Sequence, residues 1–554
     1  MKSASHRLLK LLLLSALALT ALSLWGCASR PEAAPAAPEA RADTTPDTSL
    51  YLVAVEDEPD TVDFQCTSIH YTVAQNVFNR LVEMDSDPDS AVTIRPALAE
   101  SWEVSDDGRR YTFRLRDGVR FSNGATLTAS DVDYTFHRLL THPDSCNRDI
   151  AEEILDADKL AKGEAERLEG FEIIDDLTFA ITLRQPFEAF LACLSMPGAS
   201  ILDEDTTRAA GDRFGLDPAC TVGTGSFILR EWVPGQGLLL TANPDCWEGP
   251  PKCAGLDLRF MTEPEEIRML FEAGGLDVLD LDEVGNSVEY FIHGDIYQDR
   301  LYTVPRIGTT YIALNETVKP LDDARVRKAL QLALNRVLLL DAVYSGRGSV
   351  ENGIYPHGLY GFNPDLPAIP YDPAAAKALL AEAGCAEGFD LTLSVNAAST
   401  QWEMTLMRMV VSMWEECGVR ATIEVLEDDE FMPLRKSGEL ACYSATWTAD
   451  YNDPDNFIYT FFGSRGNTRF RSLCYQDEDV MARVRAARRI VDADARLEEY
   501  RELERKIVQE DAAWIPLFSR LRYYVTSERT SGIQSSWNGS VKNKYREFTI
   551  RDTH

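Results

Sequence analysis

Strands and helices are predicted to alternate along the whole chain, and this alternation limits the possible fold more than any other feature. Residues 51–55 read as a strand, and residues 111–116 and 179–183 alternate apolar and polar side chains, as half-buried strands do. Helical patterns separate such segments, and no short repeat is present. We therefore predict an α/β fold with mixed sheets rather than a helical bundle or a β-sandwich.

The clearest helix signals surround residues 374–383. Asp372 suits the N-cap position and Pro373 suits the first helical position. Strong helix formers follow, and Gly384 stands where a left-handed residue commonly ends a helix. These signals predict a helix over 374–383.

A second helix is predicted after Asp323, where apolar residues recur at helical spacing and leave Arg325, Lys328 and Arg336 for solvent. A longer helix or helix pair is predicted over 477–510, where opposite charges stand three and four residues apart. We expect the charged face of that segment to be solvated. The apolar residues of the second helix are Val326, Ala329, Leu330, Ala333, Leu334 and Val337.

Composition excludes several classes of partner. The 554 residues suggest three or four units, at about 150 residues each. Hydrophobic residues make up 45% and charged residues 26%, which is typical of a soluble globular protein. The formal net charge of −34 argues against nucleic acid and against direct adhesion to anionic lipid, because phosphate recognition relies on clustered Lys and Arg. We expect this charge to serve solubility.

The N-terminus has the features of an export signal. Residues 1–10 are basic, residues 11–25 are mostly apolar, and small residues follow. The apolar part is too short for a comfortable membrane span. The run Leu-Trp-Gly-Cys at 24–27 resembles a lipobox, although Trp25 replaces the small or β-branched residue that is usual there.

This resemblance implies a signal peptide over 1–26 and a diacylated Cys27 as the first residue of the mature chain. Residues 27–48, rich in Pro, Ala and Glu, would then be a flexible tether. The expected location is the extracytoplasmic face of the cell membrane, held by the lipid anchor. The alternative is an ordinary export signal followed by a chance cysteine.

Ten cysteines follow Cys27, and an even number in an exported chain favours disulfides. Cys246 and Cys253 flank a short turn, and Cys385 and Cys417 each lie between a predicted helix and a predicted strand, so these are two candidate pairs. Metal binding is the competing interpretation, which the absence of any Cys-x-x-Cys disfavours. Six cysteines cannot be paired from the sequence: Cys66, Cys146, Cys193, Cys220, Cys442 and Cys474.

Common enzyme motifs are absent from the sequence. It contains no Gly-x-Ser-x-Gly elbow and no Walker loop. The glycine turn at 222–225 lacks the remaining features of a dinucleotide site. Seven histidines are scattered, and His137 and His142, five residues apart, come nearest to a helical metal-ligand spacing. We predict no catalytic residue, no metal site and no cofactor.

Residues 98–139 resemble the signature of the family 5 extracellular solute-binding proteins, the oligopeptide, dipeptide and nickel receptors of ABC importers. Leu-Ala-Glu-Ser-Trp at 98–102 and the run from Tyr111 to Phe121 carry the match. The resemblance covers essentially the whole chain after the tether. Further landmarks follow in the family's order at 222–225, 243–247, 315, 326–330, 371–373, 450–454 and 515–517.

The resemblance implies a two-lobed clamp of the periplasmic-binding-protein type (class II), which closes on its solute around a hinge. The chain is expected to cross between the lobes near 306–314 and to return near 516–523. One lobe would consist of domains I and II, and the other of domain III. The implied boundaries are 49–85, 216–307 and 519–554 for domain I, 86–215 for domain II, and 308–518 for domain III.

A solute site is also implied by the resemblance. Segment 445–456 is similar to the strand and turn of oligopeptide receptors whose aspartate pairs with the peptide's α-ammonium, and Asp450 takes that position. A carboxylate in a water-poor cleft makes a stronger charge-assisted hydrogen bond than an exposed one. The stretch from Thr446 to Ala449 would offer backbone groups, and Trp447 and Tyr451 would give aromatic cover. The alternative is that this segment is only an acidic turn.

Contacts from the opposing wall are expected from the loop after a family landmark at 59–63 and from the crossing segment. Phe64 replaces the usual proline there, and Cys66 lies in the loop, so its local shape is expected to differ from that of relatives. The candidate contacts are Thr67, Ser68, Ile69, Thr310 and Tyr311.

We therefore predict a monomeric solute-binding lipoprotein that captures short peptides and delivers them to the permease and ATPase subunits of an ABC importer. Asp450 favours a peptide over a neutral sugar, which has no ammonium group. A receptor for a nickel chelate or an oligosaccharide, and a peptide-sensing lipoprotein, remain alternatives. A hydrolase is disfavoured because no nucleophile–base arrangement is evident.

Overall fold

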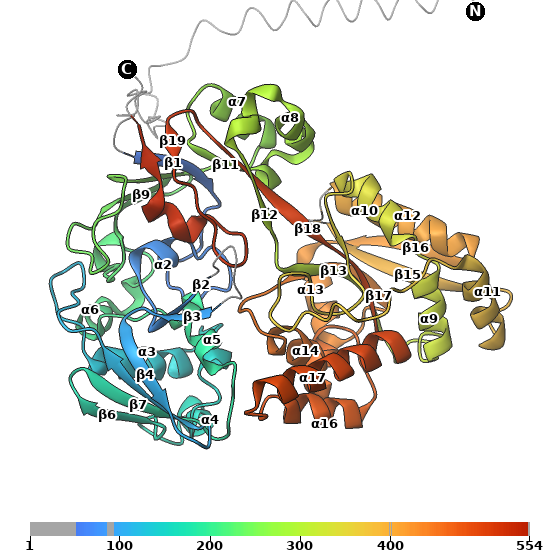
Figure 1. The fold of residues 1–554 in the computed structure, drawn as a ribbon, viewed down its shortest axis with the longest axis horizontal. Coiled ribbons are helices and arrows are strands. Elements are labelled where there is room, and N and C mark those ends of the chain that lie inside the picture. Colours follow the sequence, from blue (N-terminus) through green and yellow to red (C-terminus); the bar gives the residue numbers. More distant parts are fainter. Residues whose placement is uncertain (1–50, 86–92, 398, 400, 552–554) are drawn as a thin grey trace, which may run out of the picture. The chain divides into compact units, whose positions relative to one another are not determined.

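The computed structural model describes residues 51–85, 93–397, 399 and 401–551 (Figure 1). The predicted signal peptide, Cys27 and the tether lie outside these residues. The described residues form one compact unit. Within the described ranges, no helix combines the length and the apolar character needed to cross a membrane.

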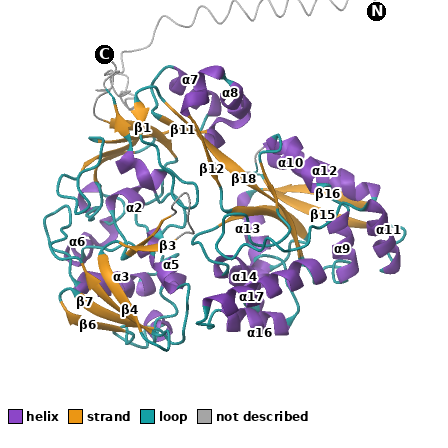
Figure 2. Cartoon of the chain, in the orientation of Figure 1, coloured by secondary structure: helices purple, strands orange, loops and turns teal. Residues whose placement is uncertain are grey.

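Strands of the described residues form five sheets (Figure 2). One four-stranded sheet has the order β1 (Tyr51–Glu56), β10 (Gly255–Phe260), β9 (Gly237–Ala242) and β8 (Phe227–Val233). Another has the order β4 (Ala99–Val104), β5 (Arg110–Leu115), β7 (Thr178–Thr182) and β6 (Phe171–Asp175). Two short ribbons pair β2 (Val82–Asp85) with β3 (Thr93–Pro96), and β19 (Thr530–Ser531) with β20 (Thr549–Ile550).

The largest sheet is built around one long strand, β18 (Trp514–Thr526, red in Figure 1). Residues 521–526 of β18 pair with two strands, and residues 514–520 pair with two others, so the strand belongs to two ladders. The main order is β11 (Val278–Asp280), β18, β13 (Gly308–Leu314), β17 (Cys442–Thr448), β15 (Phe389–Asn396) and β16 (Val419–Leu426). Two further strands, β12 (Leu301–Pro305) and β14 (Gly348–Val350), also pair with β18.

Helices connect and flank these strands (Figure 2). The first half of the chain contains α2 (Thr72–Val77), α3 (Ala129–Thr141), α4 (Ala157–Ala161), α5 (Phe190–Leu194), α6 (Glu204–Ala210), α7 (Pro264–Glu272) and α8 (Val288–His293). The second half contains α9 (Ala324–Leu332), α10 (Arg336–Tyr344), α11 (Pro373–Glu382), α12 (Gln401–Glu416), α13 (Asp428–Ser437), α14 (Asp455–Phe462), α15 (Arg465–Phe470), α16 (Glu478–Ala487) and α17 (Ala493–Arg505).

Several sequence predictions are confirmed. The strands expected at 51–55, 111–116 and 179–183 are β1, β5 and β7, each within a residue or so at its ends. Helix α11 begins as predicted, because the Asp372 carboxylate accepts a hydrogen bond of 2.9 Å from the Ala375 amide. Gly384 follows this helix with φ of 81°, the left-handed conformation that glycine adopts at no steric cost.

The helix predicted to run from Asp323 to Val337 is wrong in its second half. It ends at Leu332, and Asn335 caps a new helix by accepting a hydrogen bond of 3.0 Å from the Leu338 amide. This break resets the helical phase. Val337 is therefore 68% exposed, whereas Arg336 is buried and donates to the Ile369 carbonyl at 2.7 Å.

The predicted helix pair over 477–510 is confirmed as α16 and α17, followed by a π-helical turn at Lys506–Glu510. The expectation that its charged face is solvated is wrong for three residues. Arg488, Arg496 and Glu504 are all buried. Charge spacing along a helix cannot reveal a partner that comes from another segment.

Both candidate disulfides are absent, since all ten cysteines of the described residues are free thiols. The Cys246 sulfur lies near Ser226 and the Cys253 sulfur near the Tyr545 carbonyl, so the two face different surroundings. Strands β15 and β16 are neighbours, but the Cys385 sulfur lies 4.0 Å from the Ala383 carbonyl and the Cys417 sulfur 3.8 Å from the Pro373 carbonyl.

Apolar side chains of the described residues gather in four clusters. The largest covers β13, β17 and the first half of β18 with the helices around them, and a second covers β4, β5 and β7 with α3 and α5. The remaining two surround β1 and its neighbours. Tyr451 follows β17 in the chain, yet its ring belongs to the second cluster. This residue therefore links segments that are distant in sequence.

Candidate ligand-binding site

Strand β17 and the turn that follows it position Asp450. β17 pairs antiparallel with β13, which places Thr446 opposite Thr310, with their hydroxyl oxygens 2.9 Å apart. The strand ends at Thr448, and the Ala449 amide donates to the Ile307 carbonyl at 2.8 Å. Asp450 is therefore the first residue to leave the sheet, and its side chain is exposed.

Asn456 fixes the conformation of this turn. Its side-chain oxygen accepts hydrogen bonds from the Asp450 amide at 3.0 Å and from the Trp447 indole at 3.3 Å. Its side-chain nitrogen donates to Asp450 Oδ2 at 3.0 Å. Asn456 is itself 3% exposed, so the orientation of the Asp450 carboxylate is set by a buried group.

The electrostatic surroundings of Asp450 favour a cation that the protein itself does not supply. The side chain reaches solvent, but protein surrounds it on most sides, and this loss of water raises the pKa of Asp450 to about 6. The negative charge of Asp149 adds to the rise, while the Asn456 hydrogen bond and the charge of Arg471 oppose it. Among the ion pairs of the described residues, none includes Asp450. A cation brought by a ligand would therefore be stabilised here.

A small cavity borders Asp450. It has about 60 Å³ of space for water and is lined mainly by polar and charged side chains, with Met84, Ser195, Trp537 and Lys544 contributed by other segments. This space holds a few water molecules or a group the size of an ammonium ion. A whole peptide would have to extend beyond it.

The predicted loop at 67–69 is held near this turn. Tyr71 donates from its hydroxyl to the Thr67 carbonyl at 2.8 Å, and Asn147 donates to the same carbonyl at 2.8 Å. Burial raises the pKa of Tyr71, and the charge of Asp450 adds to that rise, so the tyrosine lies within electrostatic range of Asp450. Ser68 and Ile69 are exposed, as a ligand contact requires.

Arg471 covers the indole of Trp447. The guanidinium carbon lies 4.8 Å from the centre of the Trp447 ring, which packs edge-on against Phe461 at 5.4 Å. Burial lowers the pKa of Arg471, and Asp450 is one of the groups that offset this effect. Nothing in the sequence pointed to Arg471, because it lies outside the recognised segment and only the fold brings it to Trp447.

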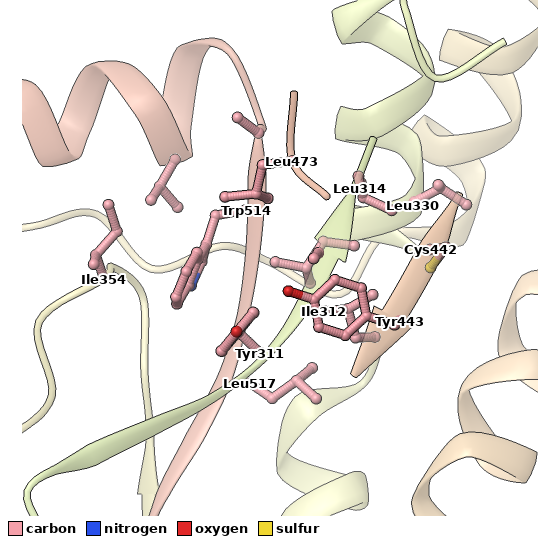
Figure 3. Close-up of a cluster of buried hydrophobic side chains, with 14 of the residues drawn as sticks. Tyr311, Ile312, Leu314, Leu330, Ile354, Cys442, Tyr443, Leu473, Trp514 and Leu517 are labelled. Carbon is pink, nitrogen blue, oxygen red and sulfur yellow. The ribbon is translucent and has the colours of Figure 1, made fainter. Parts of the chain in front are cut away.

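Tyr311 and Tyr451, which were predicted to contact the solute, are both buried, and their contact with a solute stays a prediction. Tyr311 is 2% exposed and stacks on Trp514 with ring centres 3.9 Å apart, inside the cluster drawn in Figure 3. Tyr451 is 8% exposed, and its hydroxyl donates to Asp455 at 3.1 Å. Both rings pack in apolar clusters, Tyr311 in the largest and Tyr451 in the second. A sequence pattern cannot distinguish an aromatic side chain that contacts a ligand from one that packs in the core.

The downstream half of the turn forms a buried ion-pair network that the sequence did not reveal. Asp453 accepts from Arg496 at 3.0 Å, and Asp455 pairs with Arg488 at 3.0 Å. Arg488 also reaches Glu153, which lies just before α4, at 3.0 Å. Its guanidinium lies between two rings, 3.7 Å from the centre of the Tyr459 ring and 4.3 Å from that of Phe187.

In the part of the chain that the structure describes, no cluster of three or more His, Cys, Asp or Glu side chains could hold a metal ion. The candidate site is therefore defined by one exposed carboxylate, its aromatic neighbours and a polar loop.

Comparison with known proteins identifies the family. The model of the bacterial extracellular solute-binding proteins, family 5 Middle, matches residues 93–469. The chain is 29% identical to the heme-binding protein A of Haemophilus influenzae, over 84% of this chain and 85% of that protein. It is 30% identical to the dipeptide-binding protein of Escherichia coli, over 79% of this chain and 82% of that protein.

Solved structures show the same fold. HbpA2 from Haemophilus parasuis superposes with a TM-score of 0.75 at 26% identity, over 91% of this chain and all of that one. DppA from Helicobacter pylori, in complex with the peptide STSA, superposes with a TM-score of 0.73 at 23% identity, over 91% of this chain and 98% of that one. The chain therefore belongs to the family 5 bacterial extracellular solute-binding proteins and has their two-lobed α/β clamp fold.

Proposed function

We propose that this protein is the solute receptor of an ABC importer and that its solute is a short peptide. The observation that carries the proposal is the exposed Asp450 carboxylate, which a buried Asn456 orients and which has no cationic partner within the described chain. A peptide's α-ammonium matches this position in charge and in hydrogen-bonding capacity. Relatives named as dipeptide-binding and di/tripeptide-binding proteins support this choice.

Capture would proceed by exchange of water for the ligand's ammonium group. Asp450 must be ionised, and the bound cation would pull its pKa back down because opposite charges favour the charged form. Thr446 lies beside the site on β17, and the 67–69 loop provides exposed groups on the facing side. Closure of the clamp would then exclude water and strengthen the ion pair.

The remaining parts of the proposal concern location and partners. Cys27 would carry the lipid anchor, and residues 27–48 would let the receptor reach a permease and its ATPase subunits from the extracytoplasmic face. The three-domain division predicted above, with 308–518 as the domain that carries Asp450, belongs to this proposal. The protein would act as a monomer and catalyse no reaction.

The first test identifies what the receptor binds in its host. Protein purified under native conditions is denatured, and the released small molecules are identified by mass spectrometry. A mixture of short peptides is expected, and Asp450→Ala protein should release almost none. A haem, a sugar or a metal chelate would overturn the peptide assignment and leave the receptor fold in place.

A binding titration with matched ligands tests the role of the ammonium group. One peptide from the released mixture is compared with its N-acetylated form, which has the same side chains but no charged terminus. We expect the acetylated form to bind at least about tenfold more weakly, because it loses a charge-assisted hydrogen bond. Equal affinities would show that Asp450 does not bind the charged amino terminus of the peptide.

A further inference from the structure

Cys66 and Cys146 lie close together where the 67–69 loop begins. The Cys146 amide donates to the Gln65 carbonyl at 2.9 Å, and the Cys146 sulfur lies 3.5 Å from the Cys66 carbonyl oxygen. The two cysteines are 80 positions apart in the sequence. The Cys146 sulfur therefore touches the backbone of Cys66 itself, and disulfide formation requires such close approach of the two cysteines.

The surrounding contacts keep the two segments together. Asn147, next to Cys146, donates to the Phe64 carbonyl at 3.0 Å and to the Thr67 carbonyl at 2.8 Å, so it spans the chain on both sides of Cys66. These hydrogen bonds do not involve either sulfur. They hold the segments in register while the thiols react.

The two thiols differ in the way that a stepwise exchange requires. Cys146 is exposed and can be reached by a reagent in solution. Cys66 is half-buried, and its sulfur lies 3.3 Å from Nδ1 of His142. Burial raises the pKa of the Cys66 thiol, and the neighbouring charge of Asp63 raises it further, which makes Cys66 a poor first nucleophile.

We propose that Cys66 and Cys146 form a redox pair, which closes to a disulfide when the exported protein meets a small-molecule disulfide donor such as oxidised glutathione. Export is part of the proposed function, and this inference rests on it because thiols persist in the cytosol and are oxidised outside it.

The reaction balances in two exchange steps. The Cys146 thiolate attacks one sulfur of the donor, which forms a mixed disulfide and expels one donor thiolate. His142 then accepts the Cys66 proton, and the Cys66 thiolate attacks the Cys146 sulfur and expels the second donor thiolate, which takes up a proton. Two protein thiols are oxidised to one disulfide, and the donor disulfide is reduced to two thiols.

The cross-link would stiffen one wall of the ligand site. Thr67 follows Cys66 directly, and its carbonyl is the acceptor shared by Tyr71 and Asn147. Joining Cys66 to Cys146 therefore fixes the start of the 67–69 loop to the segment that carries Asn147. Slower amide hydrogen exchange is expected in this loop in the oxidised protein than in the reduced protein.

The test uses the full-length protein and oxidised glutathione. After treatment, free thiols are alkylated, the protein is digested without reduction, and the peptides are identified by mass spectrometry. A peptide pair linked through Cys66 and Cys146 is expected, with the loss of two hydrogens, and it should disappear after reduction by dithiothreitol. Alkylation of both cysteines after oxidation, or a link from either one to a third cysteine, would overturn the proposal.

Single substitutions test the order of the steps. In Cys66→Ser protein, Cys146 should keep one glutathione, because no second thiol can displace it. In Cys146→Ser protein, Cys66 should remain unmodified. Cys385→Ser, which removes another half-buried thiol, is the matched control and should leave the cross-link unchanged. A glutathione adduct on Cys66 in the Cys146→Ser protein would contradict the assigned order.

These measurements need no ligand. A missing cross-link in protein that binds peptides would reject the redox pair alone, and a normal cross-link in protein that binds no peptide would reject the proposed function alone.

Discussion

Asp450 and Asp455 stand in the same acidic turn, and their surroundings differ in almost every respect. Asp450 is exposed, forms no ion pair within the described chain and is oriented by one amide. Asp455 is fully buried, pairs with Arg488 and accepts hydrogen bonds from the hydroxyls of Tyr451 and Tyr500. The downstream carboxylate holds the turn in place, and the upstream one is left available to a ligand.

This difference bears on the two interpretations of the segment. A binding aspartate and a structural acidic turn were alternatives at the level of sequence, and the structure assigns the structural role to Asp453 and Asp455. The binding role stays a proposal for Asp450. A recognised motif can therefore contain neighbouring residues of one type that serve different purposes, and partner contacts separate them better than the motif does.

The largest expected effect comes from Asp455→Ala. Removing one partner of a buried ion pair costs about 3–5 kcal/mol of folding stability, and here Arg488 and two tyrosine hydroxyls lose a partner together. Urea unfolding should show a large fall in the midpoint. Asp450→Ala, measured beside it, should change the midpoint little. Equal losses in the two variants would remove the distinction between the two carboxylates.

A smaller effect is expected on binding from Asp450→Asn. The substitution keeps the size of the side chain and removes its charge. Hydrogen bonds to charged groups contribute about 1.5–3 kcal/mol, so peptide affinity should fall about 10–100-fold. Isothermal titration with one defined peptide measures this change. Asp365→Asn, at an exposed aspartate away from the site, is the control and should bind normally.

The pH dependence of binding follows from the raised pKa of Asp450, about 6. An ammonium ion binds the ionised carboxylate, so affinity should weaken as pH falls from 7 to 5, by about tenfold if the site titrates alone. Asp450→Asn should flatten this dependence. An unchanged slope in that variant would assign the titration to another group.

Folding stability should respond to pH in the opposite sense at this residue. The folded pKa lies above the unfolded value, so the folded state binds the proton more tightly. The contribution of Asp450 is therefore present at low pH and is lost as pH rises through the window from the ordinary aspartate pKa of 3.8 to about 6. Ligand-free unfolding curves of the wild type and of Asp450→Asn across that window measure it.

The smallest effect is expected from Glu153→Gln. Glutamine keeps an acceptor for Arg488 but loses the charge, and Arg488 retains Asp455, so the expected cost is on the order of 1 kcal/mol. Because Glu153 and Asp455 come from segments far apart in the sequence, X-ray scattering of the ligand-free variant should report a more expanded receptor. An unchanged profile would show that this contact does not help to hold the segments together.

Local features of the fold were predictable, and long-range ones were not. The cap at Asp372 and the glycine at 384 depend on residues within one helical turn, so the sequence contains all the information needed to predict them.

Arg336 and Val337 were misassigned because a new cap at Asn335 reset the helical phase. The family resemblance pointed to Asp450 as a candidate, whereas the burial of Tyr311 depends on Trp514, 203 positions away. Arg471 reaches Trp447 only through the fold, and no motif marked it.

Strand β18 has a mechanical consequence. Because one continuous strand belongs to two ladders, the parts of the sheet on either side of residue 520 can rotate by small dihedral changes spread over several residues.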